Sequence, residues 1–380
     1  MNKKINKGKI KILVVIASLS MGGEERIVTD IIKNINRDRF EVGVCLFEKK
    51  GELLSKVPPD VPIFDLKKKS RWSFLFLIIK LKGIIRKYKP DIVFSALWYS
   101  TFISACSNFI FNLKYPFLIA HEPHNHKLDI KGERFQKLKS ILMNWSHSKA
   151  DVIVTISKGS AYNIAKDYFI EKDKIIVIHN SIELKLIESS KLEKVSDPWF
   201  KENIPTVSTL GRLIPRKGYS DLLRAFRLVR DQQHARLIII GEGESKSELR
   251  KLTRKLSLND DVLFLGYQDN PFKFIYKSNV FVLSSHREGF GNVIIEAMAC
   301  GIPVISTNCP SGPDEIITDG VNGLLVPVGD VEAMASAITR LFKDETLREK
   351  LSVDGRRRAE DFRVEKIVKE YESLFSTRIV

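Results

Sequence analysis

Short, almost wholly apolar runs alternate along the chain with longer stretches in which apolar residues recur every three or four positions. The runs are typical of buried parallel strands, and the stretches are typical of helices that cover a sheet. In the first half we predict strands at 11–18, 40–47, 61–66, 91–97, 116–121, 151–157 and 175–180. In the second half we predict strands at 206–210, 235–240, 262–265, 280–284 and 303–307, and a short one at 323–326. The pattern predicts an α/β fold with two Rossmann-like, doubly wound parallel-sheet domains facing across a cleft.

A charged segment poor in long apolar runs, 186–204, separates the two halves and is interpreted as a linker. We therefore expect an N-terminal domain at 1–185, a C-terminal domain at 205–355, and a segment at 356–380 that holds one long amphipathic helix over 356–375. A length of 380 residues suits two domains. Lysines precede the apolar run 12–20, as in a signal peptide, but a glycine pair and a helical pattern follow it, so we interpret this run as the first strand.

The stretch 286–305, HREGFGNVIIEAMACGIPVI, joins two predicted strands and carries two glutamates. We expect a glycine turn followed by a helix that begins near Asn292 and stops at Gly301. Glu288 then lies in the loop, and Glu296 lies about one turn inside the helix, roughly 6 Å further along its axis. Doubly wound folds bind ligands at this edge of the sheet, and the free N–H groups of a first helical turn suit an anion. We expect a phosphate site between the two carboxylates; the plainer alternative is a helix cap and a solvated surface charge.

Two cations follow the first strand of the second half. Gly211 and Arg212 come directly after that strand, and Lys217 lies in the same loop. A guanidinium fork and a lysine point charge at the carboxyl edge of a sheet suit a diphosphate, although surface cations on a loop are the alternative. The pair Gly22–Gly23 after the first strand of the chain is either a simple turn or a point of close approach for a phosphate or a second substrate.

A histidine-rich run, HEPHNH at 121–126, ends the strand 116–121. Three histidines and a carboxylate invite a metal interpretation. In an extended stretch, however, His124 and His126 point to one side and His121 to the other, so a single histidine, His121, that donates or accepts a hydrogen bond to substrate is the more economical hypothesis. The four cysteines form no CxxC pair and are interpreted as free thiols in a reducing compartment.

The net charge of +16 lies almost wholly in the first half. Residues 1–190 hold 33 Lys+Arg and 19 Asp+Glu, a net +14, which leaves +2 for the rest. Such a half-molecule is attracted to polyanions. A basic cluster precedes the predicted helix 72–88, and further basic residues lie within it. Such a helix is either a crossover helix with a solvated face or an interfacial helix on anionic lipid. No nucleic-acid-binding module is visible, and no apolar run is long enough to span a membrane.

Taken together, these residues resemble the retaining glycosyltransferases of family 4, which have the GT-B fold, and the resemblance covers nearly the whole chain. Its most specific part is EGFGNVIIE at 288–296. Further matches are GGEER at 22–26, His121, HNS at 179–181, and Gly211–Arg212 with Lys217. The chain departs from the family at Glu24, where alanine is common, at Glu122, where aspartate or asparagine is commoner, and at 180–182, which reads NSI in place of NGV.

The resemblance implies that the last helix, over 356–375, crosses back onto the N-terminal domain. It also implies a role for each matching position. Arg212 and Lys217 would bind the donor diphosphate and stabilise the leaving group with no metal required. Glu288 would contact the hydroxyls of the donor sugar, Glu296 would hold the ribose, and His121 would lie near the transferred sugar. The remaining donor contacts would come from Gly23 near the phosphates and acceptor, from Gly266 and Tyr267 at the base, and from Gly289, Phe290, Gly291, Asn292 and Val293 at sugar and phosphate.

The leading hypothesis is therefore a retaining transfer of a hexose or N-acetylhexosamine from a UDP-linked donor. The acceptor would be lipid-linked or membrane-borne, and the product would belong to bacterial surface-glycan assembly. We expect no cofactor, no metal and no nucleic-acid partner. The basic first half predicts a cytoplasmic protein that is peripheral at the cytoplasmic face of the membrane. Two alternatives stay open: a nucleotide-sugar epimerase of the same fold, and a non-catalytic basic adaptor for membrane or nucleic acid.

Overall fold

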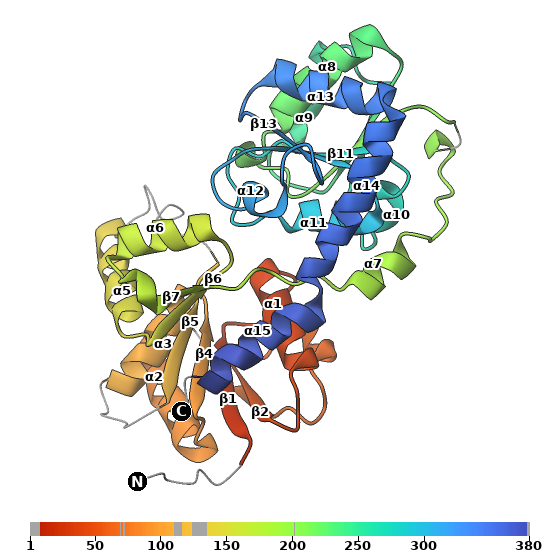
Figure 1. Cartoon of the computed structure of the whole chain (residues 1–380). Coiled ribbons are helices and arrows are strands. Elements are labelled where there is room, and N and C mark those ends of the chain that lie inside the picture. Colours follow the sequence, from red (N-terminus) through yellow and green to blue (C-terminus); the bar gives the residue numbers. More distant parts are fainter. Residues whose placement is uncertain are drawn as a thin grey trace. The chain divides into compact units, whose positions relative to one another are not determined.

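The computed structural model describes residues 8–68, 70, 73–109, 116–123, 135–200 and 202–377, and it divides into two compact units (Figure 1). Unit 1 comprises residues 1–181 and 364–380, and unit 2 comprises residues 182–363. The boundary precedes the segment 186–204, which packs within unit 2. Lys191 Nζ donates to the carbonyl of Ala299 at 3.3 Å, and the Arg236 guanidinium donates to the carbonyl of Trp199 at 2.5 Å.

Unit 1 contains a parallel sheet in the order β3-β2-β1-β4-β5-β6-β7. The strands are β1 (Ile10–Ile16), β2 (Phe40–Leu46), β3 (Ile63–Asp65), β4 (Ile92–Ala96), β5 (Phe117–His121), β6 (Val152–Thr155) and β7 (Ile175–Val177). The helices are α1 (Gly23–Asn34), α2 (Phe74–Tyr88), α3 (Trp98–Phe109), α5 (Gln136–Ser148), α6 (Lys158–Tyr168) and α15 (Val364–Thr377), with short 3₁₀ turns at Glu52–Lys56 and Lys172–Lys174. Every strand predicted for the first half forms, with ends that differ by a few residues.

Both faces of this sheet are buried, because side chains alternate across a strand. Along β1, Ile12 and Val14 point into the core that includes α1 and α15. Leu13 and Val15 point into the opposite core, which includes α2, α3, α5 and α6. The near-continuous apolar runs of the sequence therefore arise from strands that are covered on two sides.

Unit 2 contains a parallel sheet in the order β10-β9-β8-β11-β12-β13. Its strands are β8 (Thr206–Leu210), β9 (Arg236–Ile240), β10 (Val262–Gly266), β11 (Val280–Leu283), β12 (Val304–Thr307) and β13 (Leu324–Val326). Its helices are α7 (Leu184–Ser190), α8 (Tyr219–Gln232), α9 (Lys246–Lys255), α10 (Phe272–Ile275), α11 (Asn292–Cys300), α12 (Pro313–Ile316), α13 (Val331–Lys343) and α14 (Glu345–Ala359), with 3₁₀ turns at Pro198–Phe200, Pro215–Lys217 and Glu360–Phe362. The predicted pair of doubly wound parallel sheets is confirmed.

The single helix predicted over 356–375 is wrong. α14 ends at Ala359, a 3₁₀ turn follows, and Arg363 is extended (φ −60°, ψ 144°) before α15 begins. The helical ladder stops here because Ile182 N–H donates to the carbonyl of Phe362 at 2.9 Å, and the Phe362 ring is buried against Phe290 with ring centroids 5.6 Å apart. Phe362 therefore belongs to unit 2, and α15 packs in unit 1, where Phe375 contacts the rings of Phe40 and Phe94.

Three further observations bear on the sequence-based predictions. Among the described residues no helix is long and apolar enough to cross a bilayer. The same residues hold no group of three or more His, Cys, Asp or Glu side chains placed to share a metal ion. His124 and His126 lie outside the described residues.

Candidate active site

Two loops of unit 2 meet where the strand order of its sheet reverses. β8 lies between β9 and β11, so the chain after β8 and the chain after β11 leave the sheet side by side at its carboxyl edge. The first loop carries Gly211 to Gly218 and the second carries Ser284 to Gly291. An edge of this kind is where open α/β sheets bind ligands.

A lysine and a glutamate, one from each loop, form an ion pair at this edge. Lys217 Nζ lies 2.5 Å from Glu288 Oε1, and the two side chains are only 14% and 9% exposed. The Ser285 hydroxyl donates to the same carboxylate oxygen at 2.6 Å, and the Thr307 hydroxyl donates to the carbonyl of Ser285 at 2.5 Å. Because a charge-assisted hydrogen bond in a largely dry site is strong, Glu288 is held in one orientation.

The backbones of the two loops are also joined. His286 N–H donates to the carbonyl of Arg216 at 2.8 Å, and the Ser284 hydroxyl donates to the carbonyl of Lys217 at 2.9 Å. Gly218 has φ +63°, and a Cβ there would lie 2.0 Å from the carbonyl oxygen of Ser284. Only glycine permits this close approach, so the position of Lys217 depends on the residue that follows it.

Two weak acids near Glu288, the Tyr219 hydroxyl and the Cys309 thiol, have raised pKa values. Burial is the main reason that the pKa of the Tyr219 hydroxyl is raised above its ordinary value, and Glu288 adds to the effect. Burial likewise raises the pKa of the Cys309 thiol to about 11, again with a contribution from Glu288. Both groups therefore stay protonated near neutral pH.

α11 begins directly after the second loop, as predicted from the glycine turn. Its N-cap, Gly291, is left-handed (φ +103°), and the helix stops at Gly301 (φ +82°). The Phe290 side chain is buried, and a Cβ on Gly312 would lie 2.1 Å from the Phe290 carbonyl oxygen, so close packing fixes the start of the helix. In this first turn the N–H of Ile294 donates to the carbonyl of Gly291 at 2.9 Å. First-turn N–H groups in general have no acceptor four residues back in their own helix, which is why such a turn suits an anion.

The other predicted donor residues lie around this pair. Arg212 is exposed, and its side chain makes no hydrogen bond or ion pair with the described part of the chain. Val293 and Glu296 are half-buried on α11, and Gly289 is half-buried in the loop before it. Gly266 ends β10 with φ +72°, and Tyr267 beside it is 63% exposed. The structure thus brings Lys217 and Glu288 into contact and places the remaining donor residues on neighbouring elements of the same unit.

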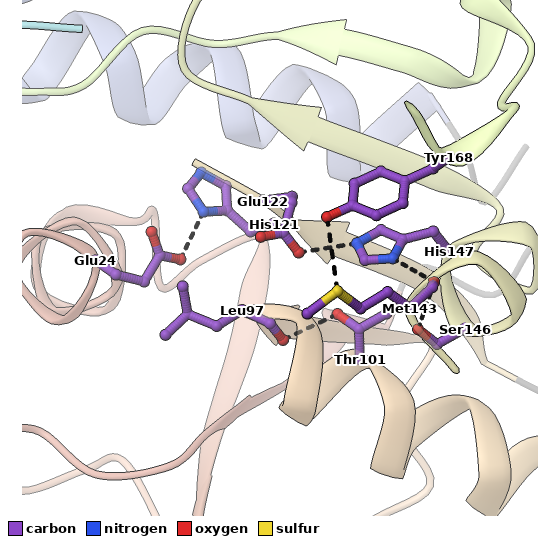
Figure 2. Close-up of polar contacts among 9 residues, drawn as sticks. All are labelled: Glu24, Leu97, Thr101, His121, Glu122, Met143, Ser146, His147 and Tyr168. Carbon is purple, nitrogen blue, oxygen red and sulfur yellow. Dashed lines mark hydrogen bonds and ion pairs between the residues drawn. The ribbon is translucent and has the colours of Figure 1, made fainter. Parts of the chain in front are cut away.

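The predicted site residues of unit 1 are His121, which ends β5, and Gly23, which is the first residue of α1. Gly23 is exposed, and a Cβ there would meet nothing within 4 Å. His121 is fully buried: its Nδ1 lies 2.6 Å from Glu24 Oε1 (Figure 2), and its Nε2 lies 2.8 Å from the Tyr371 hydroxyl. The prediction that His121 contacts substrate stays a prediction, since both ring nitrogens already have protein partners.

A second buried pair lies beside the first (Figure 2). His147 Nε2 lies 2.8 Å from Glu122 Oε2, and its Nδ1 donates to the carbonyl of Met143 at 2.7 Å. The ring of Tyr168 stacks on His147 with centroids 4.7 Å apart. All of these groups are buried, so this pair ties α5 and α6 to the end of β5.

The sequence did not reveal several of these contacts. Ser285 stands three residues before Glu288, a spacing that could have marked it as a partner of the carboxylate. Glu24 was seen only as a departure from alanine. Tyr371 had no local signal, because it lies 250 residues beyond His121 in the chain.

Comparison with known proteins identifies this combination of fold and site. Residues 21–186 match the family model described as Glycosyltransferase Family 4, and residues 192–358 match the model described as Glycosyl transferases group 1. The chain is 32% identical over 374 residues to an uncharacterised glycosyltransferase of Methanocaldococcus jannaschii, covering 87% of this chain and 90% of that protein. The protein is a glycosyltransferase with two Rossmann-like units of the GT-B type.

Two further relatives refine the placement. The N-acetylgalactosamine-N,N'-diacetylbacillosaminyl-diphospho-undecaprenol 4-alpha-N-acetylgalactosaminyltransferase of Campylobacter jejuni is 29% identical over 368 residues, covering 95% of this chain and 98% of that protein. The crystal structure of Anabaena HepE in complex with UDP superposes with a TM-score of 0.80 at 23% identity, covering 97% of this chain and all of that one. The chain belongs to glycosyltransferase family 4, and its relatives include enzymes of bacterial glycan biosynthesis.

Proposed function

We propose that this glycosyltransferase moves a hexose or N-acetylhexosamine from a UDP-linked donor to a lipid-linked glycan, with retention of anomeric configuration and without a metal ion. The observation that carries the proposal is the Lys217–Glu288 pair beside the N-terminus of α11. It offers a cation and backbone N–H groups for a diphosphate and a carboxylate for sugar hydroxyls, within one small region. The UDP complex of HepE and the diphospho-undecaprenol acceptor in the name of the Campylobacter relative support the choice of donor and acceptor.

In such a transfer, negative charge grows on the departing diphosphate. Lys217 has three N–H groups and uses one of them on Glu288, so it can also donate to a phosphate oxygen. The first-turn N–H groups of α11 and the exposed guanidinium of Arg212 would donate to the same group. Because Lys217 and the first turn of α11 are fixed before the reaction, they would supply most of the rate enhancement.

The sugar would be oriented by Glu288, whose carboxylate is already held by Ser285 and Lys217. Glu296 would accept hydrogen bonds from the ribose, and the chain at Gly266 and Tyr267 would contact the base. The acceptor hydroxyl would attack on the face from which the diphosphate departs and would pass its proton to the leaving group. No carboxylate nucleophile is needed in this scheme.

We also propose that the protein works at the cytoplasmic face of the membrane, where a lipid-linked acceptor is presented. α2 supports this proposal, because Leu75 and Ile79 are 59% and 61% exposed on a helix whose last turn carries the exposed cations Arg86 and Lys87. A helix with uncovered apolar side chains and basic residues suits an anionic bilayer surface.

The catalytic proposal is tested by incubating the protein with UDP-hexoses and UDP-N-acetylhexosamines, with and without a polyprenyl-diphosphate-linked sugar, in the presence of a metal chelator. We expect an elongated lipid-linked product that retains the anomeric configuration and that is lost in Glu288→Ala and Lys217→Ala. Conversion of the donor in the absence of acceptor would point instead to an epimerase. Unchanged turnover in both variants would show that the site is elsewhere.

The membrane proposal is tested by co-sedimentation with vesicles of phosphatidylglycerol and phosphatidylcholine. We expect binding that weakens as salt rises, because exposed charges are screened. Reversing the charges of Arg86 and Lys87 should reduce binding, while the same reversal at Lys343 and Lys350, which are exposed in unit 2, should not. Equal binding to neutral vesicles would contradict an electrostatic contribution.

A further inference from the structure

The histidine of unit 1 that resembles a family site residue, His121, has a hydrogen-bonded partner on each ring nitrogen. Nδ1 lies 2.6 Å from Glu24 Oε1, and Nε2 lies 2.8 Å from the hydroxyl of Tyr371. His121 and Tyr371 are fully buried, and Glu24 is 7% exposed. The three groups come from β5, α15 and the first turn of α1, all within unit 1.

The direction of each hydrogen bond follows from what each partner can donate. Burial, with smaller contributions from Glu24 and Glu370, raises the pKa of Tyr371 well above its ordinary value, so its hydroxyl keeps its proton. His121 Nε2 is the one hydrogen-bond partner of this hydroxyl among the described residues, so the assignment that satisfies the O–H makes Nε2 the acceptor, with a lone pair. The proton of the imidazole is then on Nδ1, where it is donated to the Glu24 carboxylate.

We propose that Glu24 and Tyr371 are positioning residues that hold His121 as the neutral Nδ1–H tautomer, and that Tyr371 competes with a hydroxyl of the sugar substrate for Nε2. The second half of this inference rests on the proposed function. His121 would act on the sugar as a hydrogen-bond acceptor, and only after the Tyr371 hydroxyl has moved aside. The side chain at position 24, a glutamate in place of the family's common alanine, would thus set which nitrogen of the histidine faces the substrate.

A purely structural role for Glu24 fits the geometry less well. Its second oxygen, Oε2, is buried and has no hydrogen-bond partner among the described residues. A carboxylate whose oxygen is left unsatisfied in a buried place is costly, and a well-packed apolar pair would serve stability at least as well. Fixing the tautomer of His121 is a task that an apolar residue cannot perform.

The neighbouring histidine provides an internal comparison. His147 Nδ1 faces the carbonyl of Met143, which only accepts, so Nδ1 carries a proton; Nε2 faces the carboxyl group of Glu122. Within the described ranges no tyrosine hydroxyl donates to His147: the ring of Tyr168 stacks on it, and the Tyr168 hydroxyl points to the sulfur of Met143. The two histidines therefore differ in the partner of Nε2, although both are fully buried.

The tautomer is tested by NMR of the full-length protein with ¹³C- and ¹⁵N-labelled histidine. We expect His121 to give the signature of a neutral ring protonated on Nδ1. Glu24→Ala removes the acceptor of Nδ1–H, so the ring should shift towards the Nε2–H form, in which Nε2 donates to the Tyr371 oxygen. Glu24→Gln should restore the Nδ1–H form, because the amide oxygen still accepts. The signals of His147 should not change in either variant. A wild-type His121 that is doubly protonated or protonated on Nε2, or a signature unchanged by Glu24→Ala, would overturn the inference.

The competition is tested with Tyr371→Phe, which keeps the buried ring and removes the hydroxyl. Loss of one competing hydrogen bond should lower the KM for the donor by about fivefold, with little change in kcat. A raised KM, or an unchanged KM with a lower kcat, would contradict competition for Nε2. The NMR result does not depend on turnover. If His121 has the expected tautomer but the protein transfers no sugar, the proposed function alone is refuted. If the enzyme is active but His121 has the other tautomer, this inference alone is refuted.

Discussion

Replacing Gly218 with alanine is the sharpest probe of how the donor loops are held together. A Cβ at this position would lie 2.0 Å from the carbonyl oxygen of Ser284 and 3.0 Å from its carbonyl carbon, whereas ordinary contact begins at 3.4 Å. Because the obstacle is backbone, the two loops must separate. The hydrogen bonds from Ser284 to Lys217 and from His286 to Arg216 would then be lost.

The magnitude can be divided into two parts by a matched control. Gly320 has φ +71°, close to the +63° of Gly218, but a Cβ there would meet nothing within 4 Å. Gly320→Ala should therefore cost only the left-handed backbone penalty of about 1 kcal/mol. Gly218→Ala should add about 1 kcal/mol for each of the two lost hydrogen bonds, roughly 3 kcal/mol in all.

Thermal unfolding and calorimetric titration with UDP measure the two consequences. For a unit of this size, Gly320→Ala should lower Tm by about 2–4 °C and Gly218→Ala by roughly 6–12 °C. UDP binding should survive in Gly320→Ala and fall strongly in Gly218→Ala, because Lys217 is displaced. If the two variants had equal Tm values and bound UDP equally well, close packing at Gly218 would not be what places Lys217.

Two further predictions concern charge and thiols in unit 2. Lys217→Ala should weaken UDP binding about 10- to 150-fold, the range for the loss of one charge-assisted hydrogen bond. Arg216→Ala removes an exposed cation from the same loop and should change UDP binding little. Equal losses of affinity in calorimetry would indicate a non-specific charge effect. Burial raises the pKa of Cys300 to about 12 and that of Cys309 to about 11, so the native thiols should resist iodoacetamide at pH 8 and react after denaturation. The same shifts predict that the thiols' contribution to the free energy of unfolding is fully present below the ordinary thiol pKa of 9.0. That contribution falls as pH rises towards 11–12, because the unfolded state releases these protons first. A urea midpoint that rose between pH 8 and pH 10.5 would contradict this prediction.

The strands were predictable because their signal is local. Runs such as residues 12–16 are apolar throughout, since both faces of each sheet are covered, and the glycines that follow them mark where the chain turns. The loop at Glu288 and the helix from Asn292 to Gly301 were predictable for the same reason. The order of these local signals was sufficient to indicate two doubly wound sheets.

The contacts between side chains within each site were less predictable from the sequence. Placing Lys217 and Glu288 at one edge follows from the topology, but their direct ion pair depends on Gly218, whose close approach to Ser284 is a three-dimensional fact. The break between α14 and α15 was missed because no proline or glycine marks it; the carbonyl of Phe362 is taken by Ile182, far away in the sequence. The hydrogen bond between Tyr371 and His121 likewise depends on α15, which is far from β5 in the sequence and packs within unit 1.

The most direct test of the proposed function is a transfer assay with a radiolabelled UDP-sugar and a polyprenyl-diphosphate-linked acceptor. We predict that the wild-type protein labels the lipid-linked product, with the anomeric configuration of the donor, and that Lys217→Ala and Glu288→Ala abolish labelling while Arg216→Ala retains it. Labelling that persists in the Lys217 and Glu288 variants, or a wild-type product of inverted configuration, would contradict the proposal.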